Sequence, residues 1–140
     1  MRSDCPLNYA LETFGDKWSL LIIRDMIFFN KRHYQEFLSS EEKISTNILA
    51  SRLATLEKNG FIKKHQAPYH KQKIIYHLTE KGIDLVPIIL EIGLWSDKYG
   101  EHIPTDKKDF VLQDARKNKA VAIKKLMNRL RKMHLTGINI

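Results

Sequence analysis

Apolar residues recur every three or four positions along most of the chain, and this spacing predicts a mainly helical fold. Pro6 suits the first turn of a helix, where its missing amide costs nothing, and Gly15 ends that helix. Asp16 is placed to cap the second helix and Ser45 the fourth. Helices are expected over residues 6–14, 16–27, 33–39, 45–59, 80–99 and 105–134.

Two shorter segments, residues 61–66 and 73–78, have the pattern of strands. Residues 67–72 lie between them, contain Pro68 and are expected to form a hairpin loop. The predicted fold class is therefore mainly α with a small β-hairpin (α+β).

The two long helices after the hairpin have their own local signals. Pro87 lies inside the first of them and should bend it, because the proline ring clashes with the preceding turn and removes a hydrogen bond. Thr105 or Asp106 is placed to cap the second.

The helix over residues 45–59 has one apolar face and one polar face. Ile48, Leu49, Leu53 and Leu56 share the apolar face, which is expected to pack on the helix before it. This pair has the form of a helix-turn-helix, in which the second helix enters the major groove of DNA. The outward side chains are short and uncharged, so they permit close approach to base edges: Thr46, Asn47, Ala50, Ser51, Ala54 and Thr55.

A lysine-rich hairpin follows that helix directly, and lysines on such a hairpin can contact phosphates. Each feature has a plainer interpretation. Capped amphipathic helices are common, and lysines also protect a hairpin from edge-to-edge pairing. The two together favour DNA binding, with Lys63 and Lys64 on the first strand. The predicted DNA-binding residues are Ser45, Thr46, Asn47, Ala50, Ser51, Arg52, Lys58, His70, Lys71 and Lys73.

Several short motifs occur in a fixed order over about residues 5–100. They are Cys5-Pro6, Gly15-Asp16-Lys17-Trp18-Ser19-Leu20-Leu21-Ile22-Ile23-Arg24, Phe37, Ile44-Ser45, Leu49, Ser51-Arg52-Leu53, Leu56-Glu57, Gly60-Phe61-Ile62 and Tyr76-His77-Leu78-Thr79-Glu80-Lys81-Gly82, with Pro87 and Trp95 further on. In this order and spacing they resemble the HxlR-type winged helix-turn-helix transcriptional regulators.

The resemblance implies a homodimer that binds double-stranded DNA at an inverted-repeat operator. It places the dimer interface in the N-terminal helix and the helices after the hairpin, and the recognition helix near Ser45. The family usually has a basic or proline-containing start to that helix, where this chain has Thr46-Asn47, so the resemblance implies DNA binding but does not indicate the operator sequence. The chain also continues about 35 residues past the usual end of the family.

The net charge of +8 is unevenly distributed. Residues 1–104 carry 14 Lys and Arg against 13 Asp and Glu, whereas residues 105–140 carry 10 against 3. We therefore expect a DNA-binding and dimerisation domain over residues 1–103 and a basic amphipathic extension over 104–140. The extension could pack its apolar stripe on a partner subunit, which is favoured, add non-specific DNA affinity, or lie on an anionic membrane surface.

Cys5, the single cysteine, starts the first helix, where the helix dipole favours a thiolate. Relatives with a cysteine beside a proline at this place include sensors of oxidants or electrophiles. The alternative is that Cys5 is a small apolar residue at the dimer interface. Both interpretations stay open.

The remaining titratable residues do not form a pattern typical of catalysis or metal binding. The six histidines are interpreted as surface or strand residues, and Asp16, Asp25, Glu41 and Glu42 as capping or surface charges. No metal, cofactor, enzymatic activity or membrane span is expected, and the predicted location is the cytoplasm. The competing function is a winged-helix protein-interaction module without specific DNA binding, which the nearly neutral body favours.

Overall fold

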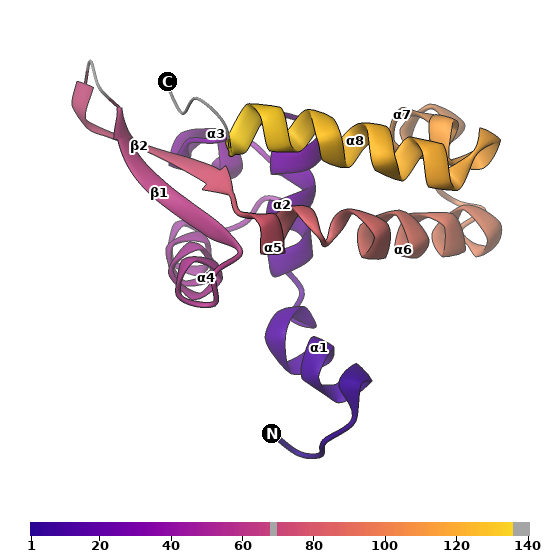
Figure 1. The fold of residues 1–140 in the computed structure, drawn as a ribbon, viewed down its shortest axis with the longest axis horizontal. Helices are drawn as coiled ribbons and strands as arrows, with labels where there is room; N and C mark the ends of the chain where they lie inside the picture. Colours follow the sequence, from indigo (N-terminus) through magenta and orange to yellow (C-terminus); the bar gives the residue numbers. More distant parts are fainter. Residues whose placement is uncertain (68–69, 136–140) are drawn as a thin grey trace.

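The computed structural model describes the backbone of residues 1–67 and 70–135, and the side chains of these residues apart from 70–72 and 108–110. It is mainly helical with one antiparallel hairpin, which confirms the predicted fold class (Figure 1). The elements in chain order are α1 (Pro6–Phe14), α2 (Ser19–Phe28), α3 (Tyr34–Leu38), α4 (Thr46–Lys58), β1 (Ile62–Ala67), β2 (His70–Leu78), α5 (Glu80–Ile83), α6 (Val86–Tyr99), α7 (Thr105–Lys117) and α8 (Lys119–His134).

The hydrophobic core forms around α2. This helix lies between α4 and the hairpin on one side and α6 and α8 on the other (Figure 1). Ile23 and Met26 of α2 have no exposed surface and pack in one cluster with Leu49 of α4 and Leu90 of α6. A helix that contacts neighbours on several sides needs apolar residues around most of its circumference, as the sequence has here.

The segment predicted as one bent helix over residues 80–99 is two helices, so that prediction is wrong. Pro87 lies in the first turn of α6, where proline is tolerated, and α5 ends at Ile83. Gly82 in α5 explains the close approach to the start of β1. A Cβ atom at this position would lie 2.2 Å from the carbonyl oxygen of Phe61.

The helix predicted over residues 105–134 is also divided. Asn118 has an extended backbone (φ −156°, ψ 98°), and its side chain accepts a hydrogen bond of 3.2 Å from the amide of Val121. Asparagine caps helices well because its short side chain competes for backbone amides. The expected cap by Thr105 or Asp106 is wrong as well, because Pro104 occupies the cap position of α7 without a side-chain hydrogen bond.

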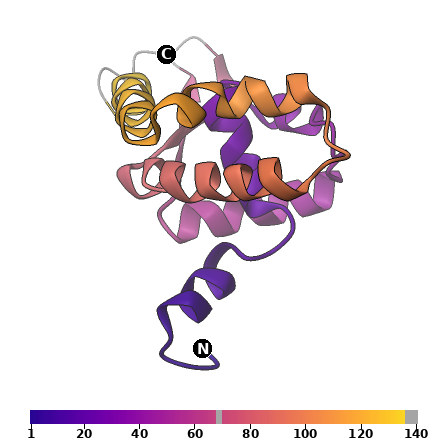
Figure 2. The same ribbon diagram turned by 90° about the vertical axis from the view of Figure 1, so that its right-hand side faces the viewer.

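The C-terminal extension packs on its own chain. Leu112 and Ala115 of α7 and Leu130 of α8 are buried in the same cluster as α2 and α6 (Figure 2). The apolar stripe of the extension was expected to pack on a partner subunit. For these three residues that expectation is wrong. They complete the core of the subunit itself.

The second strand of the hairpin is longer than predicted, whereas the first has the predicted length and is shifted by one residue. Its register runs from Ile62 opposite Leu78 to Ala67 opposite His70, with an irregularity between Gln66 and Ala67. The second strand begins at His70, so the predicted loop over residues 67–72 is too long, and Pro68 lies outside the described residues. The amide of Tyr76 also donates to the carbonyl of Arg32 at 2.8 Å. This bond ties the hairpin to the segment between α2 and α3.

Helix α1 projects from the body of the subunit (Figures 1 and 2). None of its residues is buried, and its main inward contact is the edge of the Phe14 ring against Phe61, at 6.3 Å between ring centroids. Leu7 is 67% exposed and Leu11 51%. The helix therefore presents apolar surface that the rest of its own chain does not cover.

Candidate nucleic-acid interface

Helix α4 is held firmly on the core. Ser45 caps it, as predicted, by accepting a 3.3 Å hydrogen bond from the amide of Ile48. Leu49, Leu53 and Leu56 are buried against the core. Tyr34 of α3 adds a link, because its hydroxyl donates to the carbonyl of Thr46 at 2.9 Å. The two helices are thus joined as a helix-turn-helix, with α4 as the outer element.

A buried carboxylate braces the turn between α3 and α4. The side chain of Asp25 is 3% exposed and accepts hydrogen bonds from Arg24 at 2.7 and 3.0 Å and from the Ser40 hydroxyl. Arg24 also binds both carboxylate oxygens of Glu42, at 2.7 and 2.8 Å. These bonds to Glu42 and Asp25 raise the pKa of Arg24 above its usual value. The sequence interpretation of Asp25 as a capping or surface charge is wrong, because its carboxylate is buried, whereas Glu42 is an exposed surface charge, as interpreted from the sequence.

The outer face of α4 carries the predicted short polar side chains. Ser45, Thr46, Asn47, Ala50 and Ser51 are all exposed and come from the first two turns of the helix and its cap. These five residues form the recognition surface. It is uncharged and has hydroxyl and amide groups that can both donate and accept hydrogen bonds.

Two residues of α4 lie differently from the prediction. Ile48 is 36% exposed, so it belongs to the edge of the recognition surface rather than to the buried face. Arg52 is directed toward Asp16, with 3.7 Å between Nε and the carboxylate. Partial burial alone would raise the pKa of Asp16, but hydrogen bonds from Ser19 and Trp18 and the charge of Arg52 lower it. Lys58, at the last turn of α4, is exposed.

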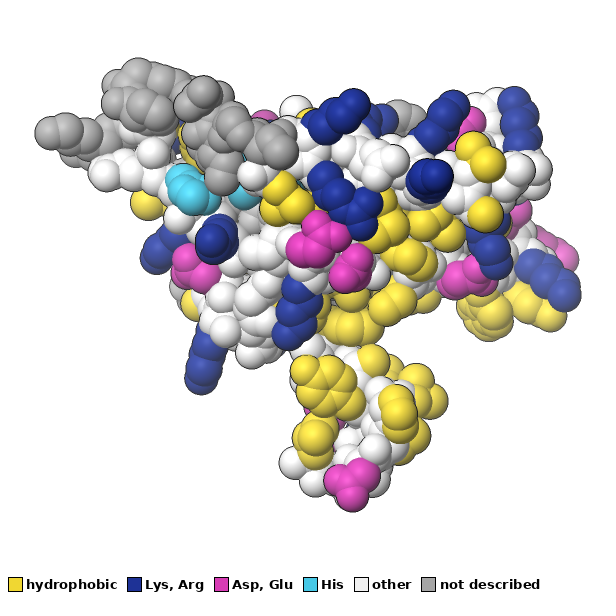
Figure 3. Space-filling view, viewed as in Figure 1, with side chains coloured by type: hydrophobic (Ala, Val, Ile, Leu, Met, Phe, Trp, Pro, Cys, Tyr) yellow, Lys and Arg dark blue, Asp and Glu magenta, His cyan; other side chains and the backbone are white. Residues whose placement is uncertain are grey.

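The hairpin places further cations beside α4. Lys63 and Lys64 of β1 are exposed, and Lys73 of β2 is half-buried. The side chains of His70 and Lys71 lie outside the described residues. Figure 3 shows Lys and Arg side chains spread over α4 and the base of the hairpin and along α8, whereas apolar side chains gather on α1 and α6.

Three histidines meet where the hairpin joins α8, which the sequence analysis missed. The ring centroids of His65 and His77 are 5.3 Å apart, and those of His77 and His134 are 5.4 Å apart. His77 lies in strand β2, as one of the two interpretations had it, but His134 is a buried helix residue, so its interpretation as a surface or strand residue is wrong. His134 Nδ1 accepts a 3.1 Å hydrogen bond from the amide of Leu78. This bond fixes α8 to the end of β2.

Burial sets the charge state of these histidines. It lowers the pKa of His77 to about 4 and of His134 to about 3, and the nearby charge of Arg32 adds to both shifts. Both rings are therefore neutral at pH 7. Among the residues that the structure describes, no group of three His, Cys, Asp or Glu side chains could hold a metal ion.

Cys5 lies at the cap position of α1 and is exposed. Hydrogen bonding to the backbone of Asn8 and Leu7 lowers the pKa of the thiol below its usual value. A lowered pKa increases the fraction of thiolate, which is the reactive form of cysteine. The sequence prediction of a thiolate favoured by the helix start agrees with this geometry.

The arrangement of helix, turn, exposed polar helix and hairpin is that of a winged helix. The model of the HxlR-like helix-turn-helix family matches residues 13–104 of the chain. The chain belongs to the HxlR-like helix-turn-helix family. This confirms the resemblance found from the motifs, and it identifies the chain as a transcriptional regulator of the helix-turn-helix type, in which the β1–β2 hairpin is the wing.

Relatives and solved structures agree with this membership. The chain is 35% identical over 98 residues to the HTH-type transcriptional regulator YodB of Bacillus subtilis. The aligned region covers 69% of this chain and 87% of YodB. It is 34% identical over 99 residues to the uncharacterized HTH-type regulator YdeP of the same organism, covering 71% and 77%.

Among solved structures, the putative transcription factor PA1607 superposes with a TM-score of 0.63 at 35% identity, over 70% of this chain and 67% of that one. The reduced form of YodB superposes with a TM-score of 0.58 at 30% identity, over 73% and 100%. The redox regulator HypR in its oxidized form gives a TM-score of 0.58 at 30% identity, over 67% and 96%. YodB has also been solved with quinone bound, and that structure gives a TM-score of 0.56 at 30% identity, over 68% and 99%.

No described helix of this HxlR-like regulator is long and apolar enough to cross a membrane. Its α7 and α8 lie entirely beyond the residues that the family model matches.

Proposed function

We propose that this regulator binds duplex DNA sequence-specifically as a homodimer on an inverted-repeat operator, with residues 1–103 as the DNA-binding and dimerisation unit and 104–140 as a helical extension. The recognition surface on α4 is the observation that carries the proposal, because its short polar side chains stand clear of the core. The lysines of the wing would contact phosphates beside it. This is a binding function without catalysis, exercised in the cytoplasm.

The dimer would form through α1 and α6. Both helices expose large apolar side chains, and such surface is characteristic of subunit contacts. A two-fold dimer places its recognition helices about 34 Å apart, one turn of DNA, and therefore reads an inverted repeat. The exposed apolar residues of these two helices are Leu7, Tyr9, Leu11, Ile88, Ile92, Trp95 and Tyr99.

The proposal is tested by selecting bound sequences from a random duplex pool and then measuring operator affinity. Asn47→Ala and Ser51→Ala should relax the preference at one or two base pairs, at about 1–3 kcal/mol each. The double variant Lys71→Gln/Lys73→Gln should instead weaken binding to all sequences and reduce the salt dependence. Lys124→Gln, an exposed change on α8 outside the recognition surface, the wing and the proposed dimer helices, serves as the control.

Two outcomes would overturn the proposal. If the pool yields no enriched inverted repeat, the chain is better described as a protein-interaction module. If Trp95→Glu leaves the sedimentation of the protein unchanged, the assignment of α6 to a dimer interface is wrong.

Cys5 supports a second, finer proposal: that the regulator senses electrophiles such as quinones. The exposed thiolate would add to the ring carbon of the quinone. A sulfur–carbon bond forms, the displaced electron pair moves to the carbonyl oxygen, and water supplies the proton. The parent protein should then lose operator affinity on treatment with quinone, while Cys5→Ser keeps it. Equal loss in both proteins would leave Cys5 as a small interface residue.

A further inference from the structure

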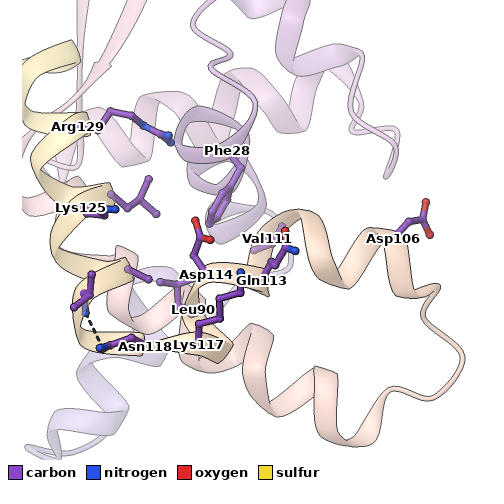
Figure 4. Close-up of a pocket in the computed structure, with 14 residues that line it drawn as sticks. Phe28, Leu90, Asp106, Val111, Gln113, Asp114, Lys117, Asn118, Lys125 and Arg129 are labelled. Carbon is purple, nitrogen blue, oxygen red and sulfur yellow. Dashed lines mark hydrogen bonds between the residues drawn. The ribbon is translucent and has the colours of Figure 1, made fainter.

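A large cleft opens between α7 and α8, in the part of the chain beyond the family match. Its volume is about 830 Å³. This size lies in the range of natural small-molecule sites, roughly 300–1,000 Å³. Phe28 at the end of α2 and Leu90 of α6 lie at its floor, and the two helices of the extension form its walls (Figure 4).

The floor and lower walls of the cleft are apolar. Phe28, Leu90, Val111, Ala115 and Leu126 line it. Leu90 and Ala115 belong to the buried core, while the other three are partly buried. A flat or branched hydrocarbon group could therefore bind to a preformed apolar surface here. Its burial would remove water from the apolar surface of the ligand and from that of the cleft.

The rim of the cleft adds two cations, Lys125 and Arg129. Arg129 reaches from α8 toward the ring of Phe28, and Lys125 lines the cleft one helical turn earlier (Figure 4). In the described part of the chain, neither side chain forms an ion pair or hydrogen bond. Their neighbours on the extension do: Lys107 pairs with Glu41, Arg116 with Asp97, Lys119 with Glu91 and Arg131 with Glu80.

Asp114 on α7 gives the cleft a third polar feature. Its carboxylate faces the same space as Arg129 and Phe28 (Figure 4). It can accept a hydrogen bond from a hydroxyl or amide group of a ligand, whereas the two cations can bind an anionic group. The polar groups therefore favour a ligand that carries both an acid and a hydrogen-bond donor on an apolar body.

We propose that the cleft between α7 and α8 is a binding site for a small amphipathic carboxylic acid. Lys125 and Arg129 bind the carboxylate, the apolar floor from Phe28 to Leu126 takes the hydrocarbon body, and Asp114 accepts a hydrogen bond from a hydroxyl on it. The unpaired cations at one side of an apolar cleft select an anion over a neutral compound of the same shape.

The site is connected to the wing through α8. This helix runs from the cleft at Leu126 to His134, which holds the amide of Leu78 at the end of β2, and Arg131 binds Glu80 next to it. A ligand that changes the position of α8 thus acts on the base of the wing. This coupling rests on the proposed DNA-binding function, whereas ligand binding itself does not.

Isothermal titration calorimetry with 6-hydroxy-2-naphthoate as the probe tests the site without DNA. The neutral 6-hydroxymethyl-2-naphthol is the matched compound. The double variant Lys125→Gln/Arg129→Gln should raise the Kd of the acid by about tenfold or more, because charge-assisted hydrogen bonds are lost. The Kd of the neutral compound should not change. Lys124→Gln, a neighbouring exposed lysine outside the cleft lining, should change neither Kd.

A second variant keeps the test independent of charge. Ala122→Phe places a ring in the cleft and should abolish binding of the acid while circular dichroism shows a folded protein. The proposal is overturned if the parent binds no acid at millimolar concentration, or if the double variant binds it equally well. It is also overturned if Ala122→Phe converts a dimer to a monomer, since the cleft would then hold a second copy of the chain.

DNA binding provides the final readout. In the parent, the acid should shift operator affinity, and in Ala122→Phe it should not. If calorimetry detects binding and the operator affinity stays constant, the proposed ligand site is supported and its proposed coupling to the wing is refuted. If the protein binds no specific operator, the proposed function fails and the calorimetric result is unaffected.

Discussion

The hydrogen bond from the Leu78 amide to His134 Nδ1 leads to a pH-dependent prediction. His134→Leu removes the acceptor and leaves a buried amide without a partner, which costs about 1–3 kcal/mol of the free energy of unfolding. His134→Asn keeps a short side chain that can accept this bond. At pH 7.5, where His134 is neutral, the asparagine variant should therefore be more stable than the leucine variant.

Lowering the pH changes the comparison. The pKa of His134 is about 3 in the folded protein and about 6.5 in an unfolded chain, so between these values the unfolded state binds a proton that the folded state does not. The free energy of unfolding of the parent then falls as the pH falls, by up to about 1.4 kcal/mol per pH unit. At pH 5 the loss from His134 is about 2 kcal/mol. Neither variant has this loss, and the similar loss at His77 occurs in all three proteins.

Urea unfolding followed by circular dichroism at pH 7.5 and pH 5, at one protein concentration, measures the effect. The stability advantage of the parent over His134→Leu should shrink by about 2 kcal/mol at the lower pH. An advantage that is the same at both pH values would show that His134 does not remain neutral in the folded protein, and the argument from burial would be refuted.

Three further substitutions test the packing, all by urea unfolding at pH 7.5. Ser45→Ala should cost about 1 kcal/mol through the lost cap of α4, and no loss would show that its bond to Ile48 contributes nothing. Gly82→Ala should cost about 1–3 kcal/mol, because the new methyl group would lie 2.2 Å from the Phe61 carbonyl; a stabilised protein would contradict this contact. Leu130→Ala should cost about 2–5 kcal/mol, whereas Val121→Ala on the exposed side of α8 should change stability by less than about 0.5 kcal/mol. Equal effects would mean that α8 is not part of the core.

The sequence predicted those features of the fold that depend on neighbours a few residues apart. The cap at Ser45 and the buried row of Leu49, Leu53 and Leu56 are both local, and both occur in the structure. The short motifs in their order and spacing carried the resemblance to the family, which the family model confirms.

Features that depend on distant contacts were missed. The ring contact of His77 with His134 joins positions far apart in the sequence, and no periodicity could indicate it. The burial of Asp25 depends on the turn that supplies Ser40 and Glu42. The break at Asn118 was hidden because the apolar stripe continues through it with little change of phase. The exposure of Ile48 reflects the limited width of the contact that α4 makes with the core.

The cleft was also beyond prediction. Its cations were counted in the sequence as part of the positive excess of residues 105–140. Only the structure separates the cations that are neutralised by acidic partners from Lys125 and Arg129, which are not.

Helix α1 has a consequence for how Cys5 would behave. A helix of nine residues without buried side chains is too short to persist alone in water. In the proposed dimer, the ordering of α1 and the association of subunits are therefore a single equilibrium that depends on protein concentration. The amides that lower the pKa of the Cys5 thiol are in place only when α1 is helical. The reactivity of this thiol would then rise with the concentration of the protein, so that the cell's supply of the regulator would set the sensitivity of each molecule.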